Sequence, residues 1–256
     1  MENSTATSMR APNDMAYVSA QLDEKKIENI FIDYPSEKKS LDQLLKDFIN
    51  FSPEVVITST TTSTINEDIK IINEMKSKKN DCLFIMKGSI FFKAPSFLLE
   101  SLDLKNIDYL IGGEIEFAAI NIINKINSSQ NDFSDIPGIF IRSGNKWIEN
   151  KFDNWNKEID DLPLPNRKKI KNNLYFRPDT GEPQATIATS RGCPSACVYC
   201  LTPTISGKKT RFRSPKSIIH ELEDCYFNHG IKNFFFKSDT FTINHSWVKD
   251  VCENIK

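Results

Sequence analysis

Hydrophobic positions in the first half of the chain form short continuous runs separated by segments of helical periodicity. The strand-like runs span residues 27–32, 55–58, 82–86 and 107–111. Apolar residues at helical spacing lie between and after them: Leu41, Leu44, Leu45, Phe48 and Ile49; Ile65, Ile69 and Ile72; and Ala119, Ile122, Ile123 and Ile126. Strands one βα unit apart, with continuous apolar character, predict a parallel sheet covered on both faces. We therefore expect an α/β fold with a doubly wound, Rossmann-like domain over residues 1–150.

The start of the chain departs from this pattern. Residues 1–16 contain no strand-like run, yet Met15, Val18 and Leu22 have the spacing of a helix that needs a sheet to pack on. The expected first strand is missing. We expect the chain to be a fragment, or to begin downstream of the natural start.

The second half of the chain repeats the alternation after a hairpin and a linker. Residues 138–142 and 147–149 resemble a hairpin, and residues 151–175 read as a linker because Pro163 and Pro165 favour an extended backbone. The elements that follow are a strand at 185–190, a helix at 215–228, a strand at 232–237 and a helix at 244–256. This order predicts the first βα units of a TIM-type barrel over residues 176–256, which is incomplete and would bind ligands at the carboxyl ends of its strands.

Composition excludes some partners. The net charge is −1 with 26% charged residues, so no basic stripe indicates nucleic acid. No apolar run is long enough to span a bilayer, and no secretory leader is present. We expect a cytoplasmic protein.

The most specific chemical pattern is CxxxCxxC, formed by Cys193, Cys197 and Cys200. Three thiolates in eight residues can hold one metal centre and leave it one ligand short. A zinc site would need a fourth ligand, and His220 lies twenty positions beyond Cys200. A disulfide framework is typical of short secreted chains. The remaining cysteines, which lie in apolar patterns, are interpreted as core: Cys82, Cys225 and Cys252.

The cysteine run resembles the cluster loop of the radical S-adenosylmethionine (SAM) enzymes. Together with the linker and the domain order, it resembles their cobalamin-binding subfamily over nearly the whole chain. The segments that carry the resemblance are 189–203, 211–215, 234–241 and the Gly-Gly-Glu-Ile-Glu turn at 112–116. The family usually has a further glycine between the two glutamates of that turn, where this chain has Ile115.

The resemblance implies three cofactors: a 4Fe-4S cluster on the three cysteines, SAM on its open iron, and cobalamin. It places Tyr199 beside the adenine of SAM, although such a tyrosine is often only packed in the core. Ser238 and Asp239, at a strand end, can accept hydrogen bonds from the SAM amino group. Arg191 and Arg213 are candidates to hold the loop or a carboxylate, or are simply solvated.

Two segments are candidates to contact cobalamin. Ser59, Thr60 and Thr61 follow a strand at the edge where α/β sheets bind ligands, and Gly112, Gly113 and Glu114 form the turn after the last Rossmann-like strand. The alternative for the hydroxyl run is that it caps the helix beginning at Ile65. The first histidine is His220, so any cobalamin in the first domain would bind without histidine ligation to cobalt.

The function implied by the resemblance is reductive cleavage of SAM to a 5′-deoxyadenosyl radical, with cobalamin-dependent methylation or rearrangement of an unreactive carbon. Two alternatives stay open: a radical SAM enzyme without cobalamin, whose first domain is a substrate or partner module, and an inactive fragment that only binds the cluster. A methylthiotransferase is disfavoured because residues 1–192 contain only Cys82. The implied partners are a small-molecule or biosynthetic-intermediate substrate, which no residue identifies, and an electron donor such as flavodoxin or ferredoxin.

Overall fold

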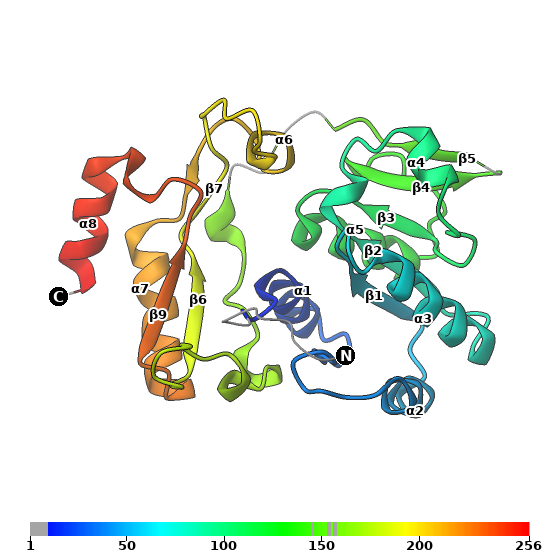
Figure 1. Ribbon diagram of the computed structural model, residues 1–256, viewed down its shortest axis with the longest axis horizontal. Helices are drawn as coiled ribbons and strands as arrows, with labels where there is room; N and C mark the ends of the chain where they lie inside the picture. The colour runs from blue at the N-terminus through cyan, green and yellow to red at the C-terminus, as the bar shows by residue number, and fades with distance from the viewer. Residues whose placement is uncertain (1–9, 145, 153–154, 156–157, 256) are drawn as a thin grey trace. The chain divides into compact units, whose positions relative to one another are not determined.

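The computed structural model describes residues 10–144, 146–152, 155 and 158–255. The chain divides into two compact units, one of residues 38–154 and the other of residues 1–37 together with 155–256. Figure 1 shows the elements of each unit. No helix in the described residues is both long and apolar enough to cross a membrane.

The unit of residues 38–154 is built on one five-stranded sheet. Its strands lie in chain order: β1 (Val55–Ser59), β2 (Leu83–Lys87), β3 (Tyr109–Ile111), β4 (Ile139–Ser143) and β5 (Lys146–Glu149). β1, β2 and β3 are parallel, whereas β4 and β5 are antiparallel to their neighbours. The parallel strands and the hairpin are confirmed, but the hairpin extends the sheet and makes it mixed.

The helices of this unit are α2 (Leu41–Phe51), α3 (Ile65–Lys78), α4 (Ser96–Glu100) and α5 (Ile115–Asn127). Phe84 and Met86 of β2 pack in a core cluster with apolar residues of α2 and α3. Ile85, which points to the opposite face, is also fully buried. Both faces of β2 are therefore covered, as its continuous apolar character predicts.

The other unit contains a smaller set of strands. β6 (Gln184–Ala188) pairs in parallel with β9 (Asn233–Lys237), and β7 (Ser190–Arg191) pairs antiparallel with β8 (Arg211–Phe212). The helices are α1 (Asn13–Glu24), α6 (Thr202–Ile205), α7 (Pro215–Glu223), which continues as a π-helical turn over Asp224–Asn228, and α8 (His245–Ile255). Strand, loop, helix, strand and helix thus follow in the predicted order. Among the described residues the parallel barrel-type strands are β6 and β9.

The start of the chain differs from the expectation in two ways. Residues 27–32 are not a strand, because they pair with no other strand; instead Phe31 packs beside Ala11 and Ala16, and the Asn29 carbonyl accepts a hydrogen bond of 3.0 Å from the Lys169 ammonium. The helix predicted near Asn13 is present as α1.

The second difference is the unit to which α1 belongs. The Asn13 amide donates to the Thr186 carbonyl of β6 at 2.6 Å, and Asp23 accepts from Asn166 and Lys169, at 2.6 Å each. Residues 10–37 therefore pack with the carboxyl-terminal half rather than with the sheet that follows them in sequence.

Candidate functional site

The candidate site lies where the two parallel strands β6 and β9 end together. The Thr189 N–H donates to the Lys237 carbonyl at 2.9 Å, and one residue further the hydroxyl oxygens of Ser190 and Ser238 lie 2.5 Å apart. The strands run side by side in Figure 1. The cysteine loop and the segment 238–240 thus leave the sheet at the same carboxyl edge, which is the edge that binds ligands in barrel folds.

The cysteine loop closes on itself before and after the motif. The Cys193 N–H donates to the Gly207 carbonyl at 3.1 Å. Gly192 has φ +84, and a Cβ atom there would lie 2.5 Å from the Lys209 carbonyl oxygen. Only glycine meets both conditions, so Gly192 and Gly207 fix the base of the loop.

The three cysteine thiols have different surroundings. Cys193 is buried and its sulfur lies 3.2 Å from the Thr240 hydroxyl oxygen. Cys200 is half-buried and its sulfur accepts the Thr202 N–H at 3.4 Å, whereas Cys197 is exposed. Hydrogen bonds lower the pKa of the Cys193 thiol below its usual range; the one with the Thr240 hydroxyl has the largest effect, and those from Ser195 come next. A lowered pKa favours the thiolate, which is the form that binds metal.

The described residues contain no group of three or more His, Cys, Asp or Glu side chains placed to hold a metal ion. The three-cysteine ligand set therefore stays a prediction. Its donor chemistry fits an iron–sulfur cluster, since three thiolates lie within eight residues of one loop.

The other three cysteines lie outside this loop. Burial raises the pKa of Cys82 to about 11 and that of Cys225 to about 12. Their interpretation as core residues is confirmed. The prediction that Cys252 is a core residue is wrong, because α8 buries Trp247 and Val251 and leaves Cys252 exposed.

The residues expected to contact SAM lie around the same edge. The Tyr199 side chain is 87% exposed, so it is not packed in the core. Ser238 contacts Ser190, and the Asp239 carboxylate accepts from the Thr202 hydroxyl at 3.3 Å. β9 ends at Lys237, so Ser238 and Asp239 follow the strand directly, as predicted.

Arg213 is buried and holds both a loop carbonyl and a carboxylate. Its guanidinium donates to the Ala188 carbonyl at 3.0 Å and pairs with Glu221 of α7. Arg167, two residues after Pro165 in the linker, donates to the same carboxylate at 2.8 Å and to the Thr186 carbonyl at 3.1 Å. The ion cluster Arg167–Glu221–Arg213 therefore ties the linker and α7 to β6. Arg191, in β7, is half-buried.

The residues expected to contact cobalamin gather at the carboxyl edge of the other unit's sheet. The Thr60 N–H donates to the Lys87 carbonyl at 2.7 Å, and the Gly88 N–H donates to the Ile111 carbonyl at 3.0 Å. The ends of β1, β2 and β3 are thereby joined side by side, and they bring together the two predicted segments: Ser59, Thr60 and Thr61, and Gly112, Gly113 and Glu114.

Three of these six residues have roles within the unit itself. The Thr60 hydroxyl donates to the Asp68 carboxylate of α3 at 2.6 Å, and the Thr61 hydroxyl lies 3.0 Å from that of Thr64. A Cβ atom at Gly112 would lie 2.2 Å from the Phe92 nitrogen. The hydroxyls of Thr60 and Thr61 hold the turn before α3, and Gly112 permits a close approach of backbone to backbone.

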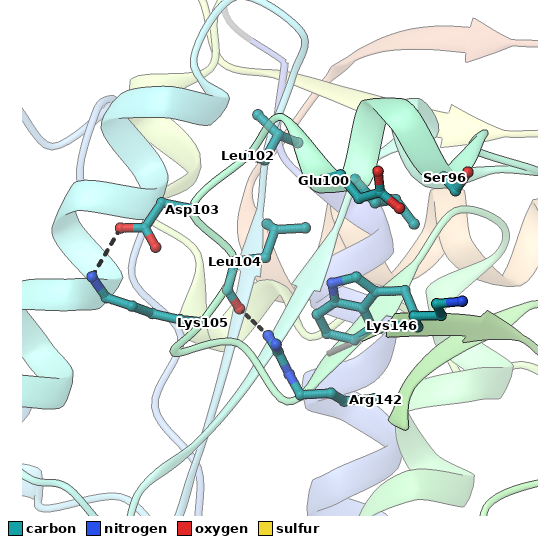
Figure 2. A pocket seen from close by; sticks show the side chains of 10 residues that line it. Ser96, Glu100, Leu102, Asp103, Leu104, Lys105, Arg142 and Lys146 are labelled. Atoms are coloured by element: carbon teal, nitrogen blue, oxygen red, sulfur yellow. Dashed lines mark hydrogen bonds and ion pairs between the residues drawn. The ribbon is translucent and has the colours of Figure 1, made fainter. Parts of the chain in front are cut away.

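A pocket of about 440 Å³ lies at the opposite edge of this sheet. Figure 2 shows Leu104 and Lys105, which precede β3, beside Arg142 and Lys146 of the hairpin. Because β4 is antiparallel to β3, this end of the hairpin meets the amino end of β3. The pocket is therefore separate from the predicted cobalamin edge.

Sequence reasoning missed several residues that shape the two edges. Arg167 and Glu221 carried no signal, since charged residues are usually solvated and their pairing spans 54 positions. The Thr240 hydroxyl contacts the Cys193 sulfur, and the Thr202 N–H contacts the Cys200 sulfur. Thr240 lies in the segment 234–241 that carries the resemblance, and its position after a strand end was the available signal.

Comparison with known proteins supports the class that this fold and site indicate. No family model matches the chain. It is 25% identical over 245 residues to an uncharacterized methyltransferase of Pyrococcus horikoshii, covering 96% of this chain and 52% of that protein. The chain thus spans about half the length of this relative.

Two solved structures share the fold. One is the radical SAM methyltransferase TsrM from Kitasatospora setae, with cobalamin and a [4Fe-4S] cluster bound: TM-score 0.75, 18% identity, covering 96% of this chain and 48% of that one. The other is the cobalamin-dependent SAM radical enzyme OxsB with aqua-cobalamin and SAM bound: TM-score 0.77, 16% identity, covering 98% and 35%.

Over almost its whole length the chain shares the fold of part of TsrM and part of OxsB. The resemblance to this class that the cysteine run and the linker indicated is confirmed.

Proposed function

We propose that this chain is the cluster-binding part of a radical SAM enzyme that cleaves SAM reductively to a 5′-deoxyadenosyl radical. The observation that carries the proposal is the placement of the CxxxCxxC loop after β6 and the short strand β7, beside Ser238 and Asp239, which follow β9. A 4Fe-4S cluster, when bound, supplies the electron that cleaves SAM.

The roles of the residues follow from their positions. Cys193, Cys197 and Cys200 hold the cluster through three thiolates. Asp239 and Ser238 accept hydrogen bonds from the SAM amino group, since a carboxylate retains acceptor capacity beyond its contact with Thr202. The exposed ring of Tyr199 offers a flat apolar surface to the adenine.

We further propose that the sheet of residues 38–154 binds cobalamin at the carboxyl edge of β1–β3 and that the enzyme methylates or rearranges an unreactive carbon. The fold shared with TsrM and OxsB supports this proposal. No histidine precedes His220, so the cobalt would have no imidazole ligand from this unit.

A second candidate is a radical SAM enzyme without cobalamin. One observation favours it: the hydroxyls of Thr60 and Thr61 are engaged within the turn before α3. In that case the unit of residues 38–154 would contact substrate or a partner. In either case we propose a small-molecule substrate and a low-potential one-electron donor such as flavodoxin or ferredoxin.

Corrin binding separates the two candidates. The chain is reconstituted anaerobically with iron, sulfide and hydroxocobalamin and then desalted. The cobalamin proposal predicts corrin absorbance at about one equivalent per chain, and a Co(II) electron paramagnetic resonance (EPR) signal without hyperfine coupling to a protein imidazole. Loss of all corrin on desalting, with the cluster retained, would favour the second candidate.

A further inference from the structure

Thr240, in the segment that follows β9, contacts the first cysteine of the loop. Its hydroxyl oxygen lies 3.2 Å from the Cys193 sulfur, across 47 positions of sequence. Cys193 is the most buried cysteine of the loop, and its N–H is held by the Gly207 carbonyl at 3.1 Å. The sulfur and the hydroxyl are thus fixed by two different elements of the same unit.

The direction of this hydrogen bond follows from the state of the sulfur. A hydroxyl can donate or accept, but a metal-bound thiolate has no proton and can only accept. With a cluster on Cys193, Thr240 must therefore be the donor. A hydrogen bond to a charged acceptor is stronger than a neutral one.

We propose that Thr240 is a positioning residue that donates a hydrogen bond to the cluster thiolate of Cys193 and raises the reduction potential of the cluster. This inference rests on the proposed function. Reduction adds negative charge to the cluster, so a donor at a ligand sulfur stabilises the reduced form more than the oxidised form. Ser195 also hydrogen-bonds to the Cys193 sulfur, and the Thr202 N–H donates to the Cys200 sulfur. Substitution of Thr240 leaves these other donors in place.

The neighbouring residue Asp239 strengthens the geometric argument. Asp239 accepts from the Thr202 hydroxyl, and Thr202 donates its N–H to the Cys200 sulfur. The segment after β9 therefore reaches both the first and the third cysteine of the motif. The segment that follows β9 would thus contact the cluster ligands through Thr240 and, by way of Thr202, Asp239, and would also contact the SAM amino group.

The test compares three variants of the full chain, each reconstituted anaerobically. Thr240→Val removes the hydroxyl at nearly constant volume, Thr240→Ser restores it, and Thr204→Val makes the same chemical change at an exposed position of α6. Iron and sulfide are measured first. The cluster potential is then determined by mediated titration with a low-potential reductant, followed by EPR.

We expect Thr240→Val to keep the iron content but to lower the ratio of reduced to oxidised cluster at a fixed potential. A drop of about tenfold corresponds to a shift of about 59 mV for a one-electron couple. Thr240→Ser and Thr204→Val should titrate like the parent chain.

The proposal is overturned if Thr240→Val titrates like the parent, or if Thr204→Val shifts the potential equally. If Thr240→Val binds no cluster, the test rests on Thr240→Ser. A Thr240→Ser variant that binds the cluster but has a reduction potential different from that of the parent chain contradicts the proposal. A parent chain that takes up no four-iron cluster would instead refute the proposed function itself.

Discussion

At the residue scale, the main feature beyond the cysteines is the buried ion cluster Arg167–Glu221–Arg213. The side chain of Glu221 is fully buried, and those of Arg167 and Arg213 are 1% and 6% exposed. The two guanidinium groups compensate one carboxylate and also satisfy the carbonyls of Thr186 and Ala188. Buried charges are tolerated only when they are paired and hydrogen-bonded in this way.

The variant Glu221→Gln tests this cluster. It keeps the shape of the side chain but removes the carboxylate that is hydrogen-bonded to both buried guanidinium groups, so we expect a loss of about 3 kcal/mol or more in the free energy of unfolding. Glu223→Gln, at an exposed position of the same helix, should change it by less than about 0.5 kcal/mol. Urea unfolding followed by circular dichroism measures both, and equal midpoints would contradict the structural role of the cluster.

At the element scale, the loop from Gly192 to Gly207 depends on backbone geometry as much as on its cysteines. Two conditions act at Gly192: a left-handed φ and a Cβ position occupied by the Lys209 carbonyl. Gly181 shares the first condition, with φ +72, but has nothing within 4 Å of its Cβ position.

The matched pair Gly192→Ala and Gly181→Ala separates these effects. Gly181→Ala should cost only the left-handed strain of roughly 1–2 kcal/mol and leave cluster content unchanged. Gly192→Ala should displace the loop and sharply lower the iron bound per chain. Colorimetric iron and sulfide assays after reconstitution give the comparison, and full iron content in Gly192→Ala would show that the loop geometry is not required.

Most elements could be predicted from local pattern. The runs before Lys87 and Ile111 are continuously apolar because their strands are covered on both faces, whereas the run before Ser59 forms a half-buried edge strand. The strand predicted at 27–32 failed because a strand needs a partner, and pairing is not encoded in the run itself. In the site, the spacing of the cysteines and the positions of the strand ends could be predicted from the sequence. The roles of Thr240, Arg167 and Glu221 could not, because they depend on contacts across long sequence separations.

At the scale of the whole molecule, one unit is discontinuous in sequence. The helix α1 is tied to β6 and the linker through Asn13 and Asp23, and the Tyr175 hydroxyl donates to Asp33 at 2.6 Å. The sheet unit of residues 38–154 has its own core. Removal of residues 1–37 should therefore affect one unit and not the other.

Hydrogen exchange on a chain that starts at Lys38 tests this division. We expect β1, β2 and β3 to keep the amide protection that they have in the full chain, because their core is intact. β6 should exchange faster, because it loses the contacts of α1 with Thr186. Unchanged protection of β6, or loss of protection throughout β1–β3, would contradict the division into these two units.

The central claim is that three cysteines hold a cluster whose fourth iron is open to SAM. The most direct measurement is the EPR spectrum of the reduced, reconstituted chain with and without SAM. We predict one four-iron cluster per chain, a spectrum that changes on addition of SAM, and loss of the cluster in a Cys193→Ala, Cys197→Ala, Cys200→Ala triple variant but not in Cys252→Ala. A triple variant with the parental iron and sulfide content, or a parental spectrum insensitive to SAM, would contradict the claim.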